Sequence, residues 1–187
     1  MASHDIWSRA GGLRARDLLA SLLAARLIDT RAGSPLYVCS PYLTDFPLFD
    51  NAFGQFSSLF RHHNEFGEKT EVLFSDTLIE LSHVAPVRIV TVHCEYSRAF
   101  LLRVVQRQNP GVSARLASEV YHEKGLLTDS FYVAGSMNHT YSGVYRRDEK
   151  IIVYTPETSD GKQKIAAGYL EFQRFWKTRE AFEVERE

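Results

Sequence analysis

The stretch that decides the fold of this chain is residues 121–154, which read YHEKGLLTDSFYVAGSMNHTYSGVYRRDEKIIVY. Three apolar runs, at 125–127, 131–134 and 151–154, are separated here by turn residues, and this spacing predicts successive β-strands. Polar residues suited to phosphate chemistry stand at the ends of these runs. The segment therefore predicts a sheet with a phosphate site at the ends of its strands.

His122 and Lys124 stand two residues apart at the start of this segment. If residues 122–127 are extended, the two side chains point to the same side and can reach one phosphate. A neutral imidazole can attack phosphorus, while an ammonium and an amide hold the non-bridging oxygens as charge builds. Lys124 and Asn138 suit these last two tasks.

Gly135, Ser136 and Glu149 complete the candidate site. A glycine permits close approach of the backbone, and a serine hydroxyl can donate to a phosphate, so both are expected to bind it. An attacking histidine also needs one ring nitrogen held protonated, usually by a carboxylate. Glu149 is the candidate for that role. By itself, a Gly-Ser pair is more often an ordinary turn.

Together, His122-x-Lys124-(x)4-Asp129 and Gly135-Ser136-x-Asn138 resemble the HKD signature of the phospholipase D superfamily. The resemblance implies a metal-independent phosphodiesterase without a cofactor, acting through a phosphohistidine. It implies that Glu149 holds the nucleophilic histidine, as in the small dimeric bacterial nucleases of that family, and that Asp129 is chiefly a structural partner. Asp129 and Gly135 are separated by five residues rather than the usual six, which predicts a tighter turn and an intact site.

The family uses two such motifs facing each other, and this chain carries one. The resemblance therefore implies a C2 homodimer with the active site across its interface.

A narrower resemblance rests on residues 40–45 and 50–51, which read SPYLTD and DN, together with the two parts of the motif. These residues look similar to the phospholipase D-like subfamily of bacterial DNA 7-deazaguanine modification and restriction clusters, named DpdK. That resemblance implies DNA as the substrate, a role in defence against foreign DNA, and other subunits of the defence system as partners.

The rest of the chain predicts alternating helices and strands. We expect an α/β fold of the phospholipase D type, a mixed β-sheet flanked by helices on both faces, in a single domain over 1–187. The apolar patterns predict strands at 36–39 and 87–92, and helices at 72–81 and from Ser97 to a stop at 109–111. They also predict a helix at about 13–29, whose buried stripe is Leu18, Leu19, Leu22, Leu23 and Leu27. A last helix is expected from about 162, with its buried stripe at Ala166, Tyr169, Leu170, Phe172, Phe175 and Trp176.

Composition sets limits on partners and location. The 187 residues carry a formal net charge of -1, which gives no bulk attraction to nucleic acid or membranes, so any anion site must be local. Two cysteines, Cys39 and Cys94, form neither a disulfide framework nor a zinc motif. No stretch approaches the length of a membrane span and no leader pattern is evident, so we expect a cytoplasmic protein without membrane contact.

Several polar residues outside the motif have two interpretations. Arg146 and Arg147 are candidates for binding the substrate backbone, although a short charge run is more often a solvated face. Tyr42 and Asp45 are candidates for lining the cleft from the loop after strand 36–39. His62 and His63 invite a metal site, but a solvated loop is the simpler interpretation. His93 and Cys94 are expected to be a buried structural pair rather than a nucleophile.

These observations favour a DNA nuclease, with RNA as the less favoured substrate. A phospholipid phosphodiesterase or transphosphatidylase would use the same chemistry but would need an apolar docking surface. A non-catalytic or partner-gated nucleic-acid-binding subunit of a defence complex is the remaining alternative.

Overall fold

In the computed structural model, which describes residues 3–29, 33–105 and 111–183, eight strands form one sheet. Its centre is parallel, because β5 pairs in parallel with β2 on one side and β6 on the other, and every other pairing is antiparallel. The α/β mixed sheet expected from the sequence is confirmed. Across the sheet the order is β1 (Ser3–Ser8), β9 (Glu149–Tyr154), β8 (Tyr132–Gly135), β7 (Gly125–Leu127), β2 (Leu36–Cys39), β5 (Val87–Val92), β6 (Val112–Ala117) and β10 (Glu180–Ala181).

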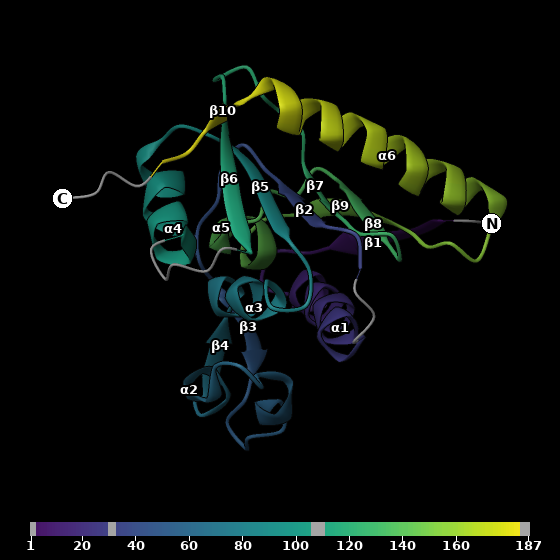
Figure 1. Ribbon diagram of the computed structural model, residues 1–187. Helices are drawn as coiled ribbons and strands as arrows, with labels where there is room; N and C mark the ends of the chain where they lie inside the picture. The colour runs from purple at the N-terminus through teal and green to yellow at the C-terminus, as the bar shows by residue number, and fades with distance from the viewer. Residues whose placement is uncertain (1–2, 30–32, 106–110, 184–187) are drawn as a thin grey trace.

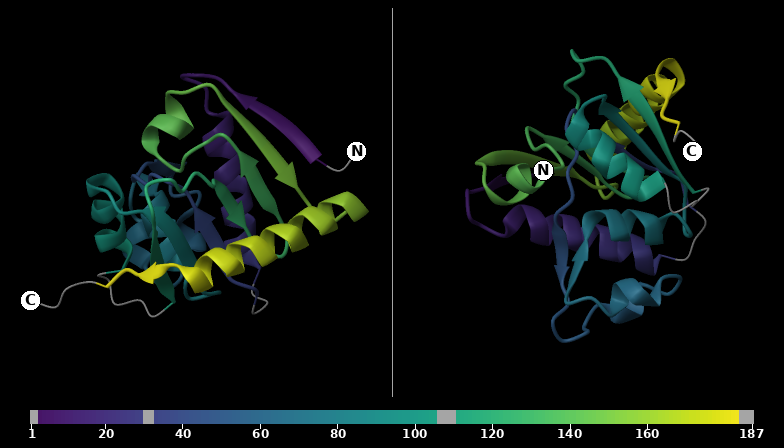
Figure 2. Two further views of the ribbon diagram at one scale, coloured as in Figure 1. Left: turned by 90° about the horizontal axis from the view of Figure 1, so that it is seen from above. Right: turned by 90° about the vertical axis from the view of Figure 1, so that its left-hand side faces the viewer.

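Helices cover both faces of this sheet (Figure 1; Figure 2). Alternate residues of β2 show the division, since Leu36 and Val38 join the larger hydrophobic cluster while Tyr37 and Cys39 join the smaller one on the opposite face. The larger cluster packs against α1 (Arg14–Ile28), α3 (Phe74–Leu81), α4 (Glu95–Val105) and α5 (Tyr141–Tyr145), and the smaller one against α6 (Ser159–Thr178).

The two long helices follow their predicted stripes to different degrees. In α1, Leu19, Leu23 and Leu27 are buried as expected. In α6, Phe172 is buried, but Ala166 is exposed and Leu170 is 72% exposed, so both assignments to the stripe were wrong. The buried face of α6 instead includes Ile165 and Gly168. Only a narrow stripe of α6 contacts the sheet, so the residues beside this stripe are exposed.

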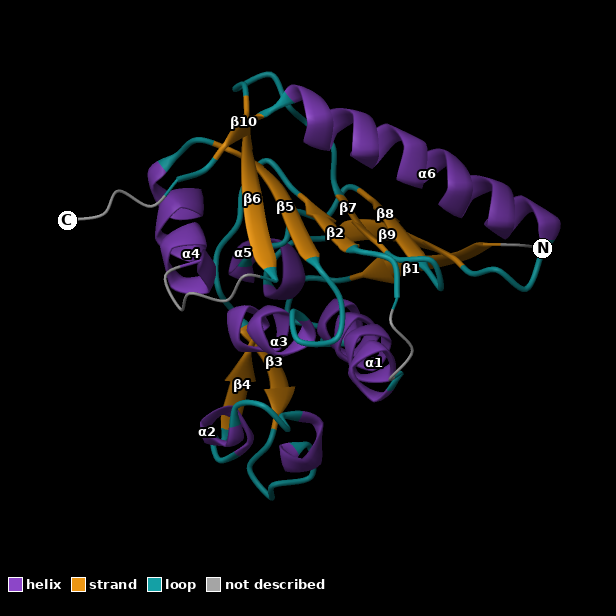
Figure 3. Ribbon diagram, in the orientation of Figure 1, coloured by secondary structure: helices purple, strands orange, loops and turns teal. Residues whose placement is uncertain are grey.

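A two-stranded arm projects from the body of the molecule, seen at the bottom of Figure 3. It is built from β3 (Pro47–Asp50) and β4 (Glu71–Leu73), which pair antiparallel, with the short helices η1 (Ser57–Leu59) and α2 (Asn64–Gly67) between them. The helix expected over 72–81 is therefore shorter, because its first two residues belong to β4.

Other differences from the expected elements are local. Neither β1 nor α5 was predicted, and α6 begins at Ser159 rather than at about 162. Ser97 does not cap α4, because it is the third residue of the helix. Its hydroxyl accepts hydrogen bonds from the Leu43 N–H and the Thr91 hydroxyl. The proposed stop at 109–111 falls largely outside the described residues.

Both cysteines are free thiols. Among the described helices, none is long and apolar enough to cross a membrane.

Candidate active site

The pairing register of four strands brings the motif segments to one edge of the sheet. Gly125, the first residue of β7, lies opposite Cys39 at the end of β2 and opposite Ala134 near the end of β8. Gly135 in turn lies opposite Ile151, two residues into β9. The segments 40–42, 121–124 and 136–138 therefore lie at the same edge of the sheet as residues 149–150, which begin β9, and we call this place the motif edge.

His122 and Lys124 lie just before β7 rather than within it. The strand begins at Gly125, so the first three residues of the expected extended run lie outside the paired part of the sheet. Instead, the Lys124 ammonium donates to the carbonyl oxygen of His122 at 2.8 Å. The His122 side chain is exposed, which leaves its ring accessible from outside the chain.

Lys124 is half-buried at this edge. Burial lowers its pKa from the ordinary lysine value, against the raising effect of the Glu123 and Glu149 carboxylates.

Glu149 is buried at 6% exposure, and its partner is Ser136. The Ser136 hydroxyl donates to the Glu149 carboxylate in a short hydrogen bond and accepts from the Lys150 N–H at 3.1 Å. Among the described residues no hydrogen bond joins Glu149 to His122. The expected orienting pair is therefore not formed in the single chain, because His122 stands on the segment before the strand.

Gly135 has a physical reason to be glycine. Its φ of +135° lies in the region that side chains avoid, and a Cβ at this position would collide with the carbonyl oxygen of Lys150. The close approach of β8 to β9 that brings Ser136 to Glu149 depends on it.

Asn138 is held by a residue to which no role was given from the sequence. The fully buried Ser40 hydroxyl donates to the Tyr42 carbonyl at 2.7 Å, lies 3.5 Å from Asn138 Oδ1, and accepts from the His139 N–H at 3.1 Å. It thereby ties the loop after β2 to the loop after β8. The Ser-Pro sequence at 40–41 signalled a strand end, but only the fold shows its partner.

Asp129 lies at the other end of β7, away from the motif edge. Its carboxylate is 3.9 Å from Arg26 of α1, and its side chain is 55% exposed. The neighbouring Thr128 accepts the Phe131 N–H through its hydroxyl at 3.2 Å and donates its N–H to the Phe131 carbonyl at 2.9 Å. This closes the tight turn that the shortened spacing predicted. The structure groups Asp129 with α1 and with none of the other motif residues.

Four predicted residues meet in one pocket of about 580 Å³. They are Tyr42, Asn138, Arg146 and Arg147, from three separate stretches of the chain. Asp45 is not among them: its carboxylate accepts from the Ser75 N–H and hydroxyl at 3.0 and 2.6 Å and pairs with Arg103 at 3.2 Å.

His62 and His63 lie in a loop, and His62 is exposed as expected, but both imidazoles have a partner. Their Nδ1 atoms lie 2.9 and 3.0 Å from the two oxygens of Glu80, whose side chain is only 2% exposed. Burial raises the pKa of Glu80, but the His62 N–H and the two imidazoles lower it more, so its net pKa is below the ordinary value. Among the described residues no group of histidine, cysteine, aspartate or glutamate side chains has a geometry that could hold a metal ion.

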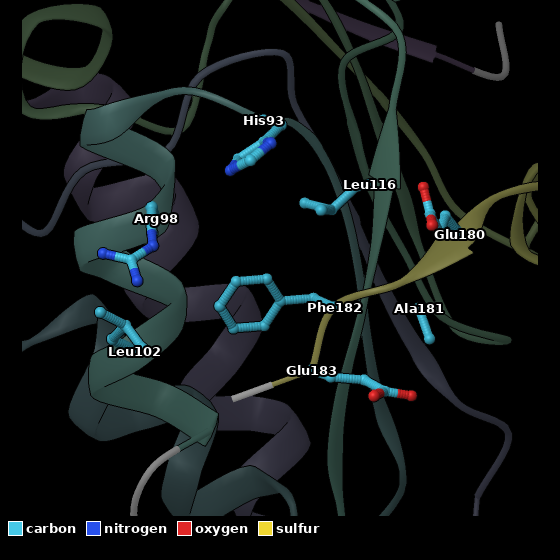
Figure 4. Close-up of a pocket in the computed structure, with 8 residues that line it drawn as sticks. All are labelled: His93, Arg98, Leu102, Leu116, Glu180, Ala181, Phe182 and Glu183. Atoms are coloured by element: carbon cyan, nitrogen blue, oxygen red, sulfur yellow. The ribbon is translucent and has the colours of Figure 1, made fainter. Parts of the chain in front are cut away.

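His93 is exposed and Cys94 is half-buried, so the expectation of a buried pair is wrong. It borders a second pocket, of about 330 Å³, into which Phe182 projects toward Leu102 of α4 (Figure 4). The Cys94 thiol lies 3.3 Å from the Ser97 hydroxyl. The carboxylates of Glu180 and Glu183 point away from His93 in Figure 4, so this pocket gathers no catalytic set.

Comparison of the sequence with protein-family models and with curated proteins finds no match. Comparison of the structure does find matches. Nuc from Salmonella typhimurium, a phospholipase D family member, is similar over 98% of this chain and 99% of its own, with 14% identity and a TM-score of 0.60.

Two further structures extend this likeness. NucT from Helicobacter pylori matches over 96% of this chain and 99% of its own, with 12% identity and a TM-score of 0.61. Phosphatidylserine synthase from Haemophilus influenzae matches over 96% of this chain but 40% of its own, with 14% identity and a TM-score of 0.54. The expected fold is confirmed, and at these identities the likeness concerns the fold alone.

Proposed function

We propose that this chain, which has the phospholipase D fold, is a metal-independent phosphodiesterase that cleaves DNA through a phosphohistidine intermediate. The observation that carries the proposal is the register of β2, β7, β8 and β9, which sets Lys124, Ser136 and Glu149 at one edge beside His122. A phosphate bound at this edge meets a nucleophile, a cation and hydrogen-bond donors together.

The roles follow from the chemistry of each group. His122 attacks phosphorus through one ring nitrogen, and the leaving oxygen departs with a proton from a second histidine. Lys124 and the Asn138 amide stabilise the charge on the non-bridging oxygens. The second histidine, now neutral, takes a proton from a water molecule that attacks the phosphorus, and the P–N bond breaks to restore His122. Ser136 holds the Glu149 carboxylate in place and donates to the bound phosphate when that carboxylate turns to His122.

The second histidine comes from a second copy of the chain. One chain supplies one His122, and its exposed ring is free to face a partner across a two-fold axis. The hydrogen bond of Glu149 to Ser136 rather than His122 supports an edge that is completed by assembly.

The biological role that we propose is cleavage of foreign DNA in the bacterial cytoplasm, together with other subunits of a defence system. The residues at 40–45 and 50–51 that resemble the 7-deazaguanine restriction subfamily support this role. The likeness to Nuc and NucT over nearly the whole of both chains supports a phosphodiester substrate.

The test is cleavage of labelled single- and double-stranded DNA in excess EDTA, with the particle mass measured in the same buffer. Wild type is expected to cleave as a dimer, and His122→Ala to lose at least about 10⁴-fold in rate. His93→Ala, which removes another exposed histidine, is the matched control and should retain the wild-type rate. Loss of activity in both variants, or complete inhibition by EDTA, would refute the mechanism.

A partner-gated binding subunit is the second candidate, and the Ser136–Glu149 contact favours it, because Glu149 does not orient His122 in the single chain. DNA binding without cleavage of any strand by wild type would select this candidate. The fold of phosphatidylserine synthase also makes phosphatidyl transfer worth measuring on phospholipid vesicles in the same assay series.

A further inference from the structure

The pocket of about 580 Å³ adjoins the motif edge, and the two share Asn138. Its walls come from separate stretches of the chain: Tyr42 from the loop after β2, Tyr96 from the first turn of α4, and Tyr141 with Arg146 from α5 and the residue after it. A ligand in this pocket therefore lies next to any phosphate held by Asn138.

Three tyrosine side chains that line this pocket are partly exposed to solvent. Tyr42 is 50% exposed, Tyr96 69% and Tyr141 40%. Tyrosine rings of a folded chain are normally covered on at least one face, since each carries a large apolar area. The Tyr141 ring stacks on Tyr145 with their centroids 5.0 Å apart, so the flat apolar faces open to a guest are those of Tyr42 and Tyr96, on two walls of the pocket.

The charged residues among the described lining are both cations, Arg146 and Arg147. The Arg146 guanidinium lies 5.1 Å from the centre of the Tyr141 ring, in the arrangement of a cation–π pair. The pocket therefore combines aromatic faces with positive charge, as proteins that bind single-stranded nucleic acid do.

The walls are held in place before any ligand arrives. The Thr44 hydroxyl accepts from the Tyr141 N–H at 2.9 Å, and the Ser40 hydroxyl links the loop after β2 to the loop that carries Asn138. A preformed pocket loses little conformational entropy when a ligand binds, and this raises the affinity for a ligand that fits it.

We infer that this pocket receives an unpaired base of a single-stranded polynucleotide, next to the phosphate that is attacked. The inference rests on the proposed phosphodiesterase function and adds the strand type of its substrate. Bases within a duplex are covered on both faces by their neighbours, so tyrosines can stack only on a base that has left the stack. A phosphate held at Asn138 with the adjoining base among the tyrosines satisfies both sites at once.

The test is equilibrium binding by fluorescence anisotropy, in EDTA at fixed salt, on the His122→Ala background so that no probe is cut. Three labelled probes of equal length are used: oligothymidylate, a strand of abasic residues with the same phosphates, and a duplex. We expect oligothymidylate to bind about five-fold or more tighter than the abasic strand, and tighter than the duplex.

Variants of the open rings locate the effect. Tyr96→Leu is expected to weaken oligothymidylate binding about five-fold or more and to leave the abasic strand unaffected, while Tyr96→Phe, which keeps the ring, should bind as the parent does. Phe53→Leu is the matched control, because Phe53 is 94% exposed on the arm beyond β3 and should have no effect. Circular dichroism and particle mass accompany each variant.

Equal affinity for base-bearing and abasic strands, or tighter binding of the duplex, would overturn the inference. A change of particle mass in Tyr96→Leu without a change of base preference would also overturn it, by showing that a second copy of the chain covers the rings. The binding results do not depend on catalysis. If the wild type cuts no DNA but binds the base-bearing strand more tightly, the proposed phosphodiesterase function is refuted and the inference about the pocket stands.

Discussion

The arm formed by residues 47–73 and the exposed part of the motif edge differ in whether their functional groups have partners within the chain. In the arm, each buried polar group has a partner within the chain, such as Asn51, whose amide donates to the carbonyls of Gly67 and Lys69 at 2.8 and 3.0 Å. At the motif edge, His122 is exposed and the tyrosines of the adjoining pocket are open. Groups that are saturated by one another hold structure, whereas groups left open to solvent can act on a ligand.

This contrast explains why similar residues received different roles. The imidazoles of His62 and His63 pair with Glu80 and so attach the arm to α3. Among the described residues, the hydrogen bond at His122 is made by its backbone carbonyl, which accepts from Lys124. The presence of histidine therefore says less about function than what surrounds its ring.

The largest expected effect on stability comes from breaking the arm's anchor. Glu80→Ala leaves His62 and His63 without their shared acceptor, and because both imidazoles are partly exposed, we expect the loss of these hydrogen bonds to cost about 2 kcal/mol. Urea denaturation should show this loss, while cleavage per folded molecule stays at the wild-type level. Glu68→Ala, an exposed carboxylate of the same arm, is the control. Unchanged stability in Glu80→Ala would mean that the arm is attached by its apolar contacts alone.

At the motif edge the expected effect is on rate. Asn138→Ala removes the amide that, in the proposed mechanism, stabilises the transition state, and loss of one such donor costs about 10²-fold to 10³-fold in kcat. Stability should change little because Asn138 is only partly buried. Single-turnover cleavage and thermal denaturation measure both. A rise in KM with unchanged kcat would assign Asn138 to ground-state binding instead.

A pH titration sharpens the comparison within one loop, because His139, next to Asn138, is buried. Burial lowers the pKa of His139 to about 4 from an ordinary value near 6.5. Between these values the unfolded chain binds more protons, so stability falls as pH falls, by about 2 kcal/mol from pH 6.5 to pH 5. Urea denaturation across this range measures it.

His139→Leu is the control for that titration and should flatten the stability curve between pH 6.5 and pH 5. The contribution of Glu80, whose pKa is lowered, is fully present above the ordinary glutamate pKa and is lost as pH falls through the lowered value. The two groups therefore titrate in separate windows. A slope that persists in His139→Leu would assign it to another group.

The smallest expected effect belongs to Asp129, which the motif includes but the structure places at the far end of β7. Its carboxylate is mostly exposed and 3.9 Å from Arg26, and exposed ion pairs contribute about 0–1 kcal/mol. Asp129→Asn should therefore change stability by less than about 0.5 kcal/mol and leave cleavage intact. A collapse of activity would show that the assembled dimer brings Asp129 to the site.

Much of the fold could be read from the sequence, because short-range patterns decide it. Apolar runs predicted β2 and β5 at their observed positions, and the three runs within 121–154 correspond to β7, β8 and β9. The predictions failed where local pattern and tertiary contact disagree. Leu170 continues the helical stripe of α6 yet is exposed, and Ser97 has the sequence of a cap yet binds the loop after β2.

The sequence by itself determined which residue types could carry out the proposed chemistry, since attack on a phosphate uses a nucleophile and groups that stabilise the developing charge whatever the fold around them. Only the tertiary structure decided which of them meet. Strand register brings the Ser136 hydroxyl to the Glu149 carboxylate and the Ser40 hydroxyl to Asn138 Oδ1. It places Asp129 at the opposite end of β7, near Arg26. Register between strands distant in the chain, such as β2 and β7, depends on tertiary packing, whereas a hairpin such as β7–β8 takes its register from its turn.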